Sequence, residues 1–600
     1  MRKESVIKRA FKMYYANNPK YLPLNFLQVV FQEISPYFNL WMSSEIVTAL
    51  YESRGKRELY LLVTVTLLGN LLIRCMGAVL NRSVESALEV LEDNEAAAFY
   101  RKTLSLDYDK LENPETRMHR LKIKENSYID GYGVYNMRVY TERMMSHIVN
   151  IAFSVILFIE MVCVIVTVSF HWLSLVLLAA MVGFLVLTVL FQFRNKTKSS
   201  AVWSEVGDLL LRENQFARGH KLDGMDNRIY RQHIIHTKLL TRFNHEHLRV
   251  FTHVVRRVFV LEMPGSVTTK LTELCAYLIV CFYCALGAFP VGSVIKYVGY
   301  LGKITDNIGR VFFTLNEFRV NEQFLKTYLE YFDIPSDMYQ GSLAVEKRSD
   351  KKYDIEFKNV SFRYAGSEAY ALQNINLQLK VGERLAVVGR NGSGKTTFIK
   401  LLCRLYDPTE GEILMNDFNV RKYDYRQYLD IFSVVFQDYH LLAVPLGNNV
   451  ASAGTWDTKK AEWLLEEVGF GERYREMPKK LETPIYKNFD EDGVNISGGE
   501  AQKIALARAL YKDAPFIILD EPTAALDPIA EAEIYSKFNE IVGDKTAIYI
   551  SHRLSSCRFC DKIAVFDEGR IVQIGTHEEL LADEAGKYYE LWHAQAQYYA

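Results

Sequence analysis

The chain has 600 residues, of which 49% are hydrophobic, 13% aromatic and 24% charged, a balance that excludes an intrinsically disordered protein. Its 71 lysines and arginines offset 72 aspartates and glutamates to a net charge of −1, so the basic excess of a nucleic-acid-binding protein is missing. Eight cysteines without zinc-type spacing exclude a disulfide scaffold and suit a reduced, cytosol-facing protein.

Apolar residues gather in the first half of the chain, in runs long enough to cross a membrane. Ile151–Phe193 carries a single acid, Glu160, over about 64 Å of helix, whereas one crossing needs about 20 apolar residues. We therefore predict two spans here, with the reversal at Ser169–Trp172. Leu59–Leu80 and Leu271–Phe289 predict two more.

Tyr21–Leu50 and Val291–Phe313 hold more polar residues and are weaker candidates, and they bring the predicted total to six spans. A membrane helix with one polar face borders a bundle interior or a wet cavity, so we expect these two to line the cavity. The alternative is that their charged ends lie beyond the bilayer, which we favour for Lys303, Asp306 and Arg310.

Polar stretches flank the spans. Basic residues in Met1–Lys20 favour a cytoplasmic N-terminus, and we expect no cleavable signal peptide. Asn81–Ser146 and Asn195–Val258 are too long for loops and rich in helix formers, which predicts helices that enter the cytosol and return. Their turning points fall at Leu106–Pro114 and Gly219–Gly224.

From Lys352 onwards strand-like and helical runs alternate, which indicates an α/β domain after a linker at Asp333–Lys352. The strand-like runs are Ile355–Tyr364, Ile375–Leu379, Arg384–Val388, Phe516–Leu519, Thr546–Ile550 and Lys562–Phe566.

Gly389–Thr396 reads GRNGSGKT between the third of these strands and a helix-like run, which is the setting that a phosphate-binding P-loop needs. Backbone N–H groups and a helix N-terminus favour phosphate there, while Lys395 can reach the terminal phosphates and Thr396 can ligate Mg²⁺. The nucleotide contacts predicted in this segment and at the residue after it are Gly389, Asn391, Gly392, Ser393, Gly394, Lys395, Thr396 and Thr397.

The apolar run Phe516–Leu519 ends in Asp520 and Glu521. An acid at the carboxyl end of a central strand is placed to bind Mg²⁺, and we assign that role to Asp520. Glu521 can then polarise the attacking water. A solvated turn is the alternative, which the P-loop upstream disfavours.

A second anion site lies at Asn495–Glu500, which reads NISGGE and precedes the helix-like Lys503–Leu510. These residues resemble the signature motif of ABC transporter ATPases, whose usual form is LSGGQ, with Ile496 in place of leucine and Glu500 in place of glutamine. The resemblance makes Ser497, Gly498, Gly499 and Glu500 nucleotide contacts.

The resemblance implies roles for four more residues. Tyr364 is similar to the aromatic residue that stacks on adenine, and Gln437 to the residue that contacts Mg²⁺ and senses the membrane domain. Asp527 resembles the D-loop aspartate and His552 the switch histidine at the γ-phosphate. The implied catalytic residues are Glu521, His552 and Gln437, and the implied Mg²⁺ ligands are Thr396, Gln437 and Asp520.

The whole chain is similar to an exporter half-transporter: an α-helical six-span transmembrane bundle with long cytosolic extensions, followed by an α/β P-loop ABC ATPase. The implied parts are a membrane domain at 1–332, a linker at 333–352 and a nucleotide-binding domain at 353–600. Coupling helices are implied near 106–114 and 219–227. Two such ATPases close head to tail on ATP, so a second half-transporter, identical or different, is implied as a partner.

Three further patterns each allow a functional and a structural interpretation. Six histidines in His220–His253 could bind metal, but we favour a solvated helix. The pairs Cys281–Cys284 and Cys557–Cys560 favour packing over redox chemistry. Acids inside apolar runs are costly, so Glu33, Glu160 and Glu273 could form an acidic substrate cavity; salt bridges to Arg74 or Lys270 are the alternative.

We therefore expect ATP-driven export of an amphipathic peptide, drug or lipid by alternating access, with ATP and Mg²⁺. The expected setting is the bacterial cell membrane, with the ATPase in the cytoplasm and no nucleic-acid partner. The alternative is an ATP-switched channel or receptor subunit without transport, against which the intact catalytic set argues. The predicted spans exclude a soluble ATPase of the DNA-repair type.

Overall fold

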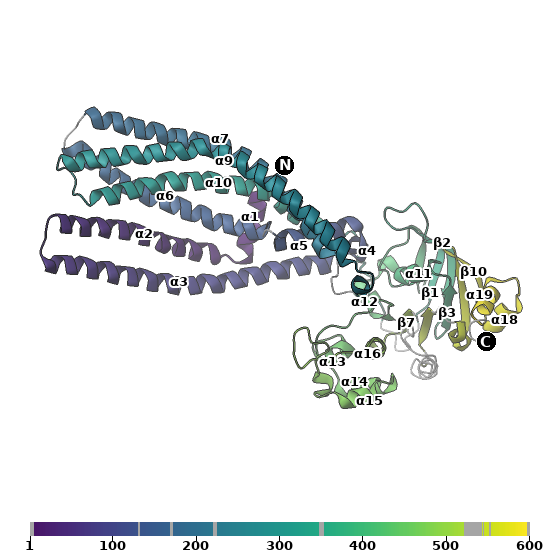
Figure 1. The fold of residues 1–600 in the computed structure, drawn as a ribbon. Helices are drawn as coiled ribbons and strands as arrows, with labels where there is room; N and C mark the ends of the chain where they lie inside the picture. The colour runs from purple at the N-terminus through teal and green to yellow at the C-terminus, as the bar shows by residue number, and fades with distance from the viewer. Residues whose placement is uncertain are drawn as a thin grey trace. The chain divides into compact units, whose positions relative to one another are not determined.

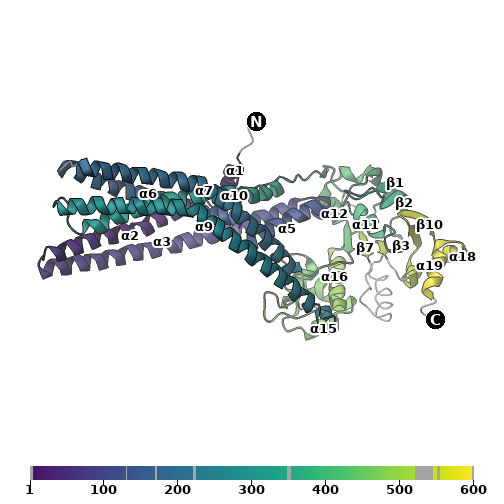
Figure 2. The same cartoon turned by 45° about the horizontal axis from the view of Figure 1, so that its top comes forward.

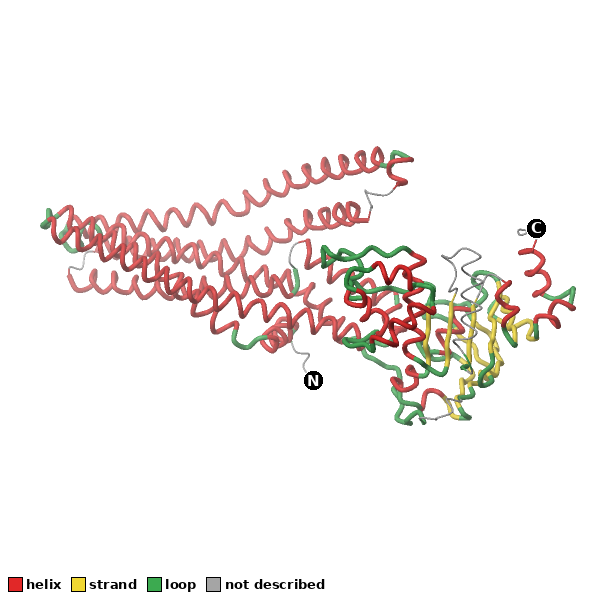
Figure 3. Tube along the Cα trace, turned by 90° about the horizontal axis from the view of Figure 1, so that it is seen from below, coloured by secondary structure: helices red, strands yellow, loops and turns green. Residues whose placement is uncertain are grey.

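A computed structural model describes residues 5–129, 132–168, 172–219, 225–346, 353–520, 543, 545–550 and 554–596. The chain divides into two compact units. A helical unit holds Met1–Leu106 and Pro114–Pro335, and an ATPase-like unit holds Asp107–Asn113 and Ser336–Ala600. The extended strands of the described residues all lie in the second unit (Figure 3).

Six helices of 31 residues or more form the body of the helical unit, within the part of the chain that is described. In both cartoon views α7 and α9 run side by side, as do α2 and α3 (Figures 1 and 2). The long helices are α2 (Tyr21–Tyr51), α3 (Lys56–Ser105), α6 (Val134–Val168), α7 (Trp172–Gly219), α9 (His233–Ala285) and α10 (Ser293–Asp333), and the shorter ones are α1 (Val6–Asn17), α5 (Pro114–Ile129) and α8 (Met225–Ile229).

Four of these helices, α3, α6, α7 and α9, are long and apolar enough to cross a membrane. The most apolar stretch of α3 has no buried residue, as expected for a helix that packs on lipid. Helices α2 and α10 are not among the four, so the total of six spans stays a prediction. The exposed apolar side chains of α3 include Tyr60, Leu61, Leu67, Leu68, Leu71 and Leu72.

The two weaker candidates turn polar side chains inward. On α2, Asn25 and Gln28 are buried, and on α10, Thr305, Asn307 and Asn321 are buried. Buried polar groups need partners, and the side chain of Asn321 both donates to and accepts from the backbone of Gly133. Of these two helices, α10 lines the cavity described below, as expected, whereas no residue of α2 is in its lining.

The ends of the long helices follow local chemistry. Helix α6 ends at Val168 and α7 begins at Trp172, and the predicted reversal at Ser169–Trp172 falls on residues that, except for Trp172, lie outside the described ones. Helix α9 ends at Ala285, because Gly287 adopts a left-handed conformation (φ +76°) and Pro290 cannot continue a helix.

The ATPase-like unit contains two sheets. A four-stranded antiparallel sheet has the order β2-β1-β4-β5, and a six-stranded sheet has the order β10-β9-β3-β8-β7-β6. The core between them is aromatic, with Phe398 of α11 packed against Phe357 and Phe566. The strands are β1 (Ile355–Phe362), β2 (Leu372–Leu379), β3 (Arg384–Gly389), β4 (Glu410–Met415), β5 (Phe418–Asn419), β6 (Phe432–Val435), β7 (Phe516–Asp520), β8 (Thr546–Ile550), β9 (Lys562–Asp567) and β10 (Arg570–Gly575).

The neighbouring strands β3, β8, β7 and β6 are parallel, so their carboxyl ends share one edge of the sheet. Ile550 at the end of β8 pairs with both Val387 of β3 and Asp520 of β7. The described helices of this unit are α4 (Tyr108–Glu112), α11 (Lys395–Leu402), α12 (Tyr425–Asp430), α13 (Leu446–Ala451), α14 (Thr458–Glu467), α15 (Gly471–Glu476), α16 (Gly498–Lys512), α18 (His577–Ala582) and α19 (Lys587–Ala596).

Candidate nucleotide-binding site

The P-loop leaves the end of β3 and enters α11 through two positions where only glycine fits. Gly389 has φ +154°, and a Cβ there would lie 2.2 Å from the carbonyl oxygen of Phe566. Gly394 has φ +103°, and its Cβ would lie 2.6 Å from the side chain of Leu372. The loop therefore packs closely against its neighbours and continues directly into the N-terminus of α11. Backbone N–H groups at a helix N-terminus favour a bound phosphate.

Two buried side chains of the loop, Lys395 and Ser393, can donate hydrogen bonds to a bound anion. Lys395 is 6% exposed, and its ammonium donates to the carbonyl oxygens of Gly389 (2.9 Å) and Arg390 (3.0 Å). The Ser393 hydroxyl is buried and has no hydrogen-bond partner among the described residues. A buried hydroxyl is normally satisfied, so a phosphate oxygen is a fitting partner. Of the other predicted contacts, Asn391, Gly392 and Thr396 are exposed and Thr397 is buried.

Two side chains with oxygen atoms follow the carboxyl ends of neighbouring parallel strands, at the sheet edge where β3 enters the P-loop. Asp520 ends β7 and is 2% exposed, and Gln437 follows the end of β6, the strand beside β7. With the Thr396 hydroxyl at the start of α11, these are the hard oxygen donors that Mg²⁺ prefers. The donor set therefore fits a magnesium ion.

Three predicted site residues, Glu521, Asp527 and His552, lie outside the described residues. The register still locates the strands that lead to them, because Asp520 and Ile550 pair across β7 and β8. Asp520 and Ile550, the last described residues before Glu521 and His552, lie at the same edge of the sheet.

Tyr364, predicted to stack on adenine, follows β1 and contacts the helix that the P-loop enters. Its hydroxyl lies 3.0 Å from the Thr397 hydroxyl. Its ring makes edge contacts with Phe362 (5.0 Å between centroids) and Tyr406 (5.5 Å). The ring is half-buried, so one part of it is open to a ligand.

The signature segment forms the N-terminus of α16. Ser497 and Glu500 make a reciprocal capping box: the Ser497 N–H donates to the Glu500 carboxylate (2.8 Å), and the Glu500 N–H donates to the Ser497 hydroxyl (3.3 Å). Glutamate performs this role as well as glutamine does, which accounts for its presence in the motif. Ser497 and Gly498 are exposed.

The charge of Glu500 is stabilised locally. Partial burial acts to raise the pKa of its carboxyl, but the hydrogen bonds from Ser497 and the nearby cations Arg473 and Lys503 outweigh burial and hold the pKa below its ordinary value. Arg473 lies 3.0 Å away. The carboxylate therefore stays ionised and caps the N-terminus of α16, next to the exposed Ser497 and Gly498.

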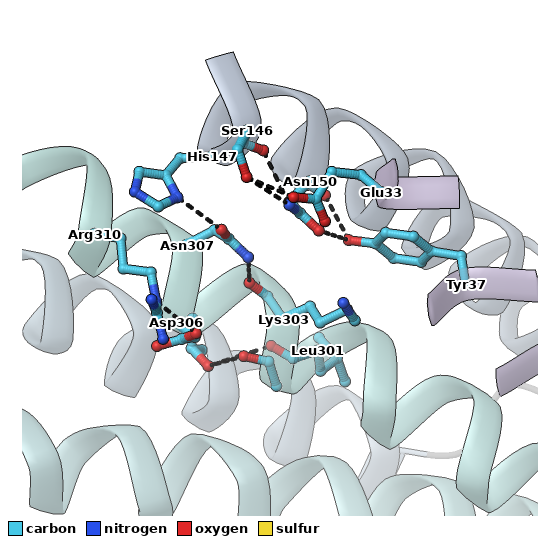
Figure 4. Close-up of polar contacts among 12 residues, drawn as sticks. Glu33, Tyr37, Ser146, His147, Asn150, Leu301, Lys303, Asp306, Asn307 and Arg310 are labelled. Carbon is cyan, nitrogen blue, oxygen red and sulfur yellow. Dashed lines mark hydrogen bonds and ion pairs between the residues drawn. The ribbon is translucent and has the colours of Figure 1, made fainter. Parts of the chain in front are cut away.

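The three acids predicted for a substrate cavity have separate partners in the helical unit. Glu33 accepts from the Ser146 hydroxyl (2.5 Å), beside the buried Tyr37–Asn150 contact (Figure 4). Glu160 pairs with Lys296 (2.9 Å), and Glu273 pairs with Lys270 (2.8 Å). One of the predicted salt bridges, that with Lys270, is therefore present at Glu273, which also lines the cavity described next, whereas the partner of Glu160 is Lys296, which the sequence did not suggest.

A cavity of about 430 Å³ lies among α7, α9 and α10. Glu273 lines it, while Glu33 and Glu160 do not. Its lining adds Glu262 and Asp306, which sequence reasoning missed as cavity acids; Asp306 also pairs with Arg310 (2.9 Å; Figure 4). Glu262, Thr269 and Glu273 lie at roughly helical spacing on α9, a signal that could have found this face.

The weaker patterns have structural counterparts. His236 is buried on α9, and the described residues contain no cluster of three metal-ligating side chains. Cys281 and Cys284 are free thiols on α9. Cys557 is buried, and burial raises the pKa of its thiol to about 12, which disfavours the reactive thiolate.

The chain is similar to known transport proteins. A family model described as ABC transporter matches residues 372–524. The ATP-dependent lipid A-core flippase of Escherichia coli is 31% identical over 70% of each chain. The subtilin transport ATP-binding protein of Bacillus subtilis is 34% identical over 55% of this chain and 54% of its own length, so the match spans about half of that relative. A bacterial Atm1-family ABC exporter with ATP bound has the same fold, with a TM-score of 0.70 at 20% identity over 96% of this chain and 99% of the other.

Proposed function

This chain belongs to the ABC transporter family, and we propose that it is an exporter half-unit that hydrolyses ATP to move an amphipathic substrate across a membrane. The proposed parts are a membrane domain at 1–332, a linker at 333–352 and a nucleotide-binding domain at 353–600. The observation that carries the proposal is the single sheet edge that unites the P-loop, Asp520 and Gln437.

Each residue at the site has a proposed task. Lys395 and the loop N–H groups bind the terminal phosphates, and Thr396, Gln437 and Asp520 would hold Mg²⁺. Glu521 orients and polarises a water molecule, His552 contacts the γ-phosphate, and Asp527 borders the partner site. The bound Mg–ATP supplies the phosphoanhydride energy. Catalysis is then positioning and charge stabilisation, without a covalent protein intermediate.

We propose that the working particle contains two half-transporters. The chain has one P-loop and one signature segment, and the N-terminus of α16 is exposed at Ser497 and Gly498. In a head-to-tail pair, this N-terminus would meet the phosphates bound by the partner's P-loop. The native mass of the purified particle separates a pair of identical chains from a pair of unlike ones.

Reconstituted protein should couple ATP consumption to movement of a solute. We expect the purified chain in liposomes, with its ATPase facing outward, to accumulate a fluorescent amphipath inside the vesicles in the presence of Mg–ATP, and not with ADP. A panel of amphipathic peptides, drugs and lipids identifies the class by its stimulation of ATPase activity. Hydrolysis that moves no solute and never changes the side to which the bundle opens would favour the switch function instead.

The cavity charge points to the substrate class. Glu262, Glu273 and Asp306 line the cavity, with Lys270 as the only cation in its lining among the described residues. We propose that it accepts the cationic group of an amphipathic peptide or drug, with Glu33 and Glu160 as further acidic positions in the bundle. The rest of the lining combines polar residues such as Thr269 and Ser266 on α9 with the apolar Phe191 and Leu261, which suits an amphipathic substrate.

The double variant Glu262→Gln/Glu273→Gln is expected to raise the concentration of a lipophilic cation that half-stimulates the ATPase by about five- to tenfold. The reason is the loss of two attractive charges at a partly buried site. Glu246→Gln, an exposed acid on the same helix outside the cavity, serves as the control. An equal shift for a neutral analogue of the same shape would contradict the charge assignment.

A further inference from the structure

Helix α4 lies in the predicted coupling segment and is anchored within the ATPase-like unit. Just before the helix, Asp107 accepts hydrogen bonds from the Ser336 hydroxyl (2.6 Å) and the Met338 N–H (2.9 Å). Lys110 forms an ion pair with Asp337 (3.1 Å). The chain enters α4 from α3 and leaves it into α5, both of which belong to the helical unit. α4 is therefore covalently continuous with both of these helices.

An aromatic chain connects α4 to the proposed adenine-binding ring. The Tyr108 ring meets the Tyr406 ring edge-on, with centroids 5.6 Å apart and planes at 89°. Tyr406 in turn meets Tyr364 edge-on, at 5.5 Å and 89°. Phe362 closes the cluster, at 5.2 Å from Tyr406 and 5.0 Å from Tyr364. Perpendicular aromatic pairs at these separations are attractive and directional.

Lys400 links the same cluster to the helix that follows the P-loop. It lies on α11, and its ammonium sits 5.4 Å from the centroid of Tyr108 and 5.8 Å from that of Tyr406. The same ammonium lies 3.7 Å from the Glu112 carboxylate at the end of α4. Both sides of the candidate nucleotide site, the adenine side and the phosphate side, therefore contact α4 through one small group of residues.

We propose that Tyr406 is a positioning residue for nucleotide binding: it holds the Tyr364 ring in place for the adenine base, and Tyr108 of α4 holds Tyr406. The inference rests on the proposed function, because it takes Tyr364 as the adenine platform. Tyr406 is 7% exposed, so it acts through Tyr364 rather than on the nucleotide directly. The consequence is that nucleotide affinity depends on the position of α4, which gives the helical unit a route to regulate it.

Replacing either end of the link should weaken nucleotide binding without slowing chemistry. In the full-length protein in lipid nanodiscs, we expect Tyr406→Leu and Tyr108→Leu each to raise the Kd for a fluorescent ATP analogue and the KM for ATP by about three- to tenfold. The kcat should stay within about twofold, because the catalytic groups are untouched. Tyr406→Phe keeps the ring and should restore the affinity. The double leucine variant should fall short of the product of the single effects, since both break one chain of contacts.

Tyr474→Leu is the matched control, because Tyr474 is 6% exposed in the same unit but lies on α15, outside this cluster. It should lower the melting temperature and leave the Kd unchanged. An unchanged Kd for Tyr406→Leu with a similar loss of melting temperature would reduce Tyr406 to a packing residue and overturn the proposal. An unchanged Kd for Tyr108→Leu alone would show that α4 does not help to position Tyr406. Wild-type protein that binds no nucleotide would instead refute the proposed function.

Discussion

Replacing Lys395 by alanine is expected to reduce ATP hydrolysis by the purified chain about 10²- to 10³-fold, the cost of losing one charge-stabilising donor at a reacting centre. In the structure the ammonium is buried and held by two carbonyl oxygens of its own loop. It is thus already positioned where the terminal phosphates would bind, and no other lysine in the loop can replace it. Nucleotide affinity should fall as well. The measurements are phosphate release and binding of a fluorescent ATP analogue.

Lys512 provides a matched control for this variant. Its ammonium also donates to a backbone carbonyl, that of Leu429 (2.9 Å), but it lies at the end of α16. Lys512→Ala should leave hydrolysis within about twofold of the wild type. Comparable losses in the two variants would indicate a general stability effect, and retained hydrolysis in Lys395→Ala would contradict its assignment to the phosphates.

Glu521→Gln is expected to separate binding from turnover. The substitution keeps the shape and hydrogen-bonding capacity of the side chain but removes the carboxylate that polarises water, so the hydrolysis rate should fall by about 10²-fold or more while ATP still binds. Trapped nucleotide should remain as ATP, which chromatography of the extracted nucleotide measures. Accumulation of a stable two-chain particle with ATP is the accompanying expectation of the half-transporter pairing.

The contrast with Asp520→Asn tests the division of labour between the two adjacent acids. Asp520 is buried at the end of β7 and is assigned to Mg²⁺, so its loss should shift the magnesium dependence of hydrolysis to higher concentration. Glu521→Gln should leave that dependence unchanged. Near-normal turnover in Glu521→Gln would refute its role as the water-polarising residue, whatever the behaviour of Asp520.

Most strands of the ATPase-like unit could be predicted from local sequence patterns. Six strands were expected from apolar runs, and each has a counterpart among the described strands. Strands β4, β5, β6 and β10 were not predicted, because their apolar stretches are only a few residues long, as in Ile413–Met415 of β4, or are interrupted by a polar residue, as in β6 and β10. Glu500 was a departure from the usual motif in the sequence. The structure shows that Glu500 forms a capping box with Ser497, a contact set by the three-residue spacing at the start of α16.

The sequence by itself determined the family, the P-loop, the order of the two parts and the apolar spans, because each is a contiguous pattern set by backbone geometry or by the length of a bilayer. Only the tertiary structure decided which distant side chains meet. Glu160 pairs with Lys296 across 136 residues, Glu262 and Asp306 line one cavity with Glu273, and Tyr108 reaches Tyr364 through Tyr406. Such contacts depend on how separate helices and strands pack against each other, and no local pattern encodes that packing.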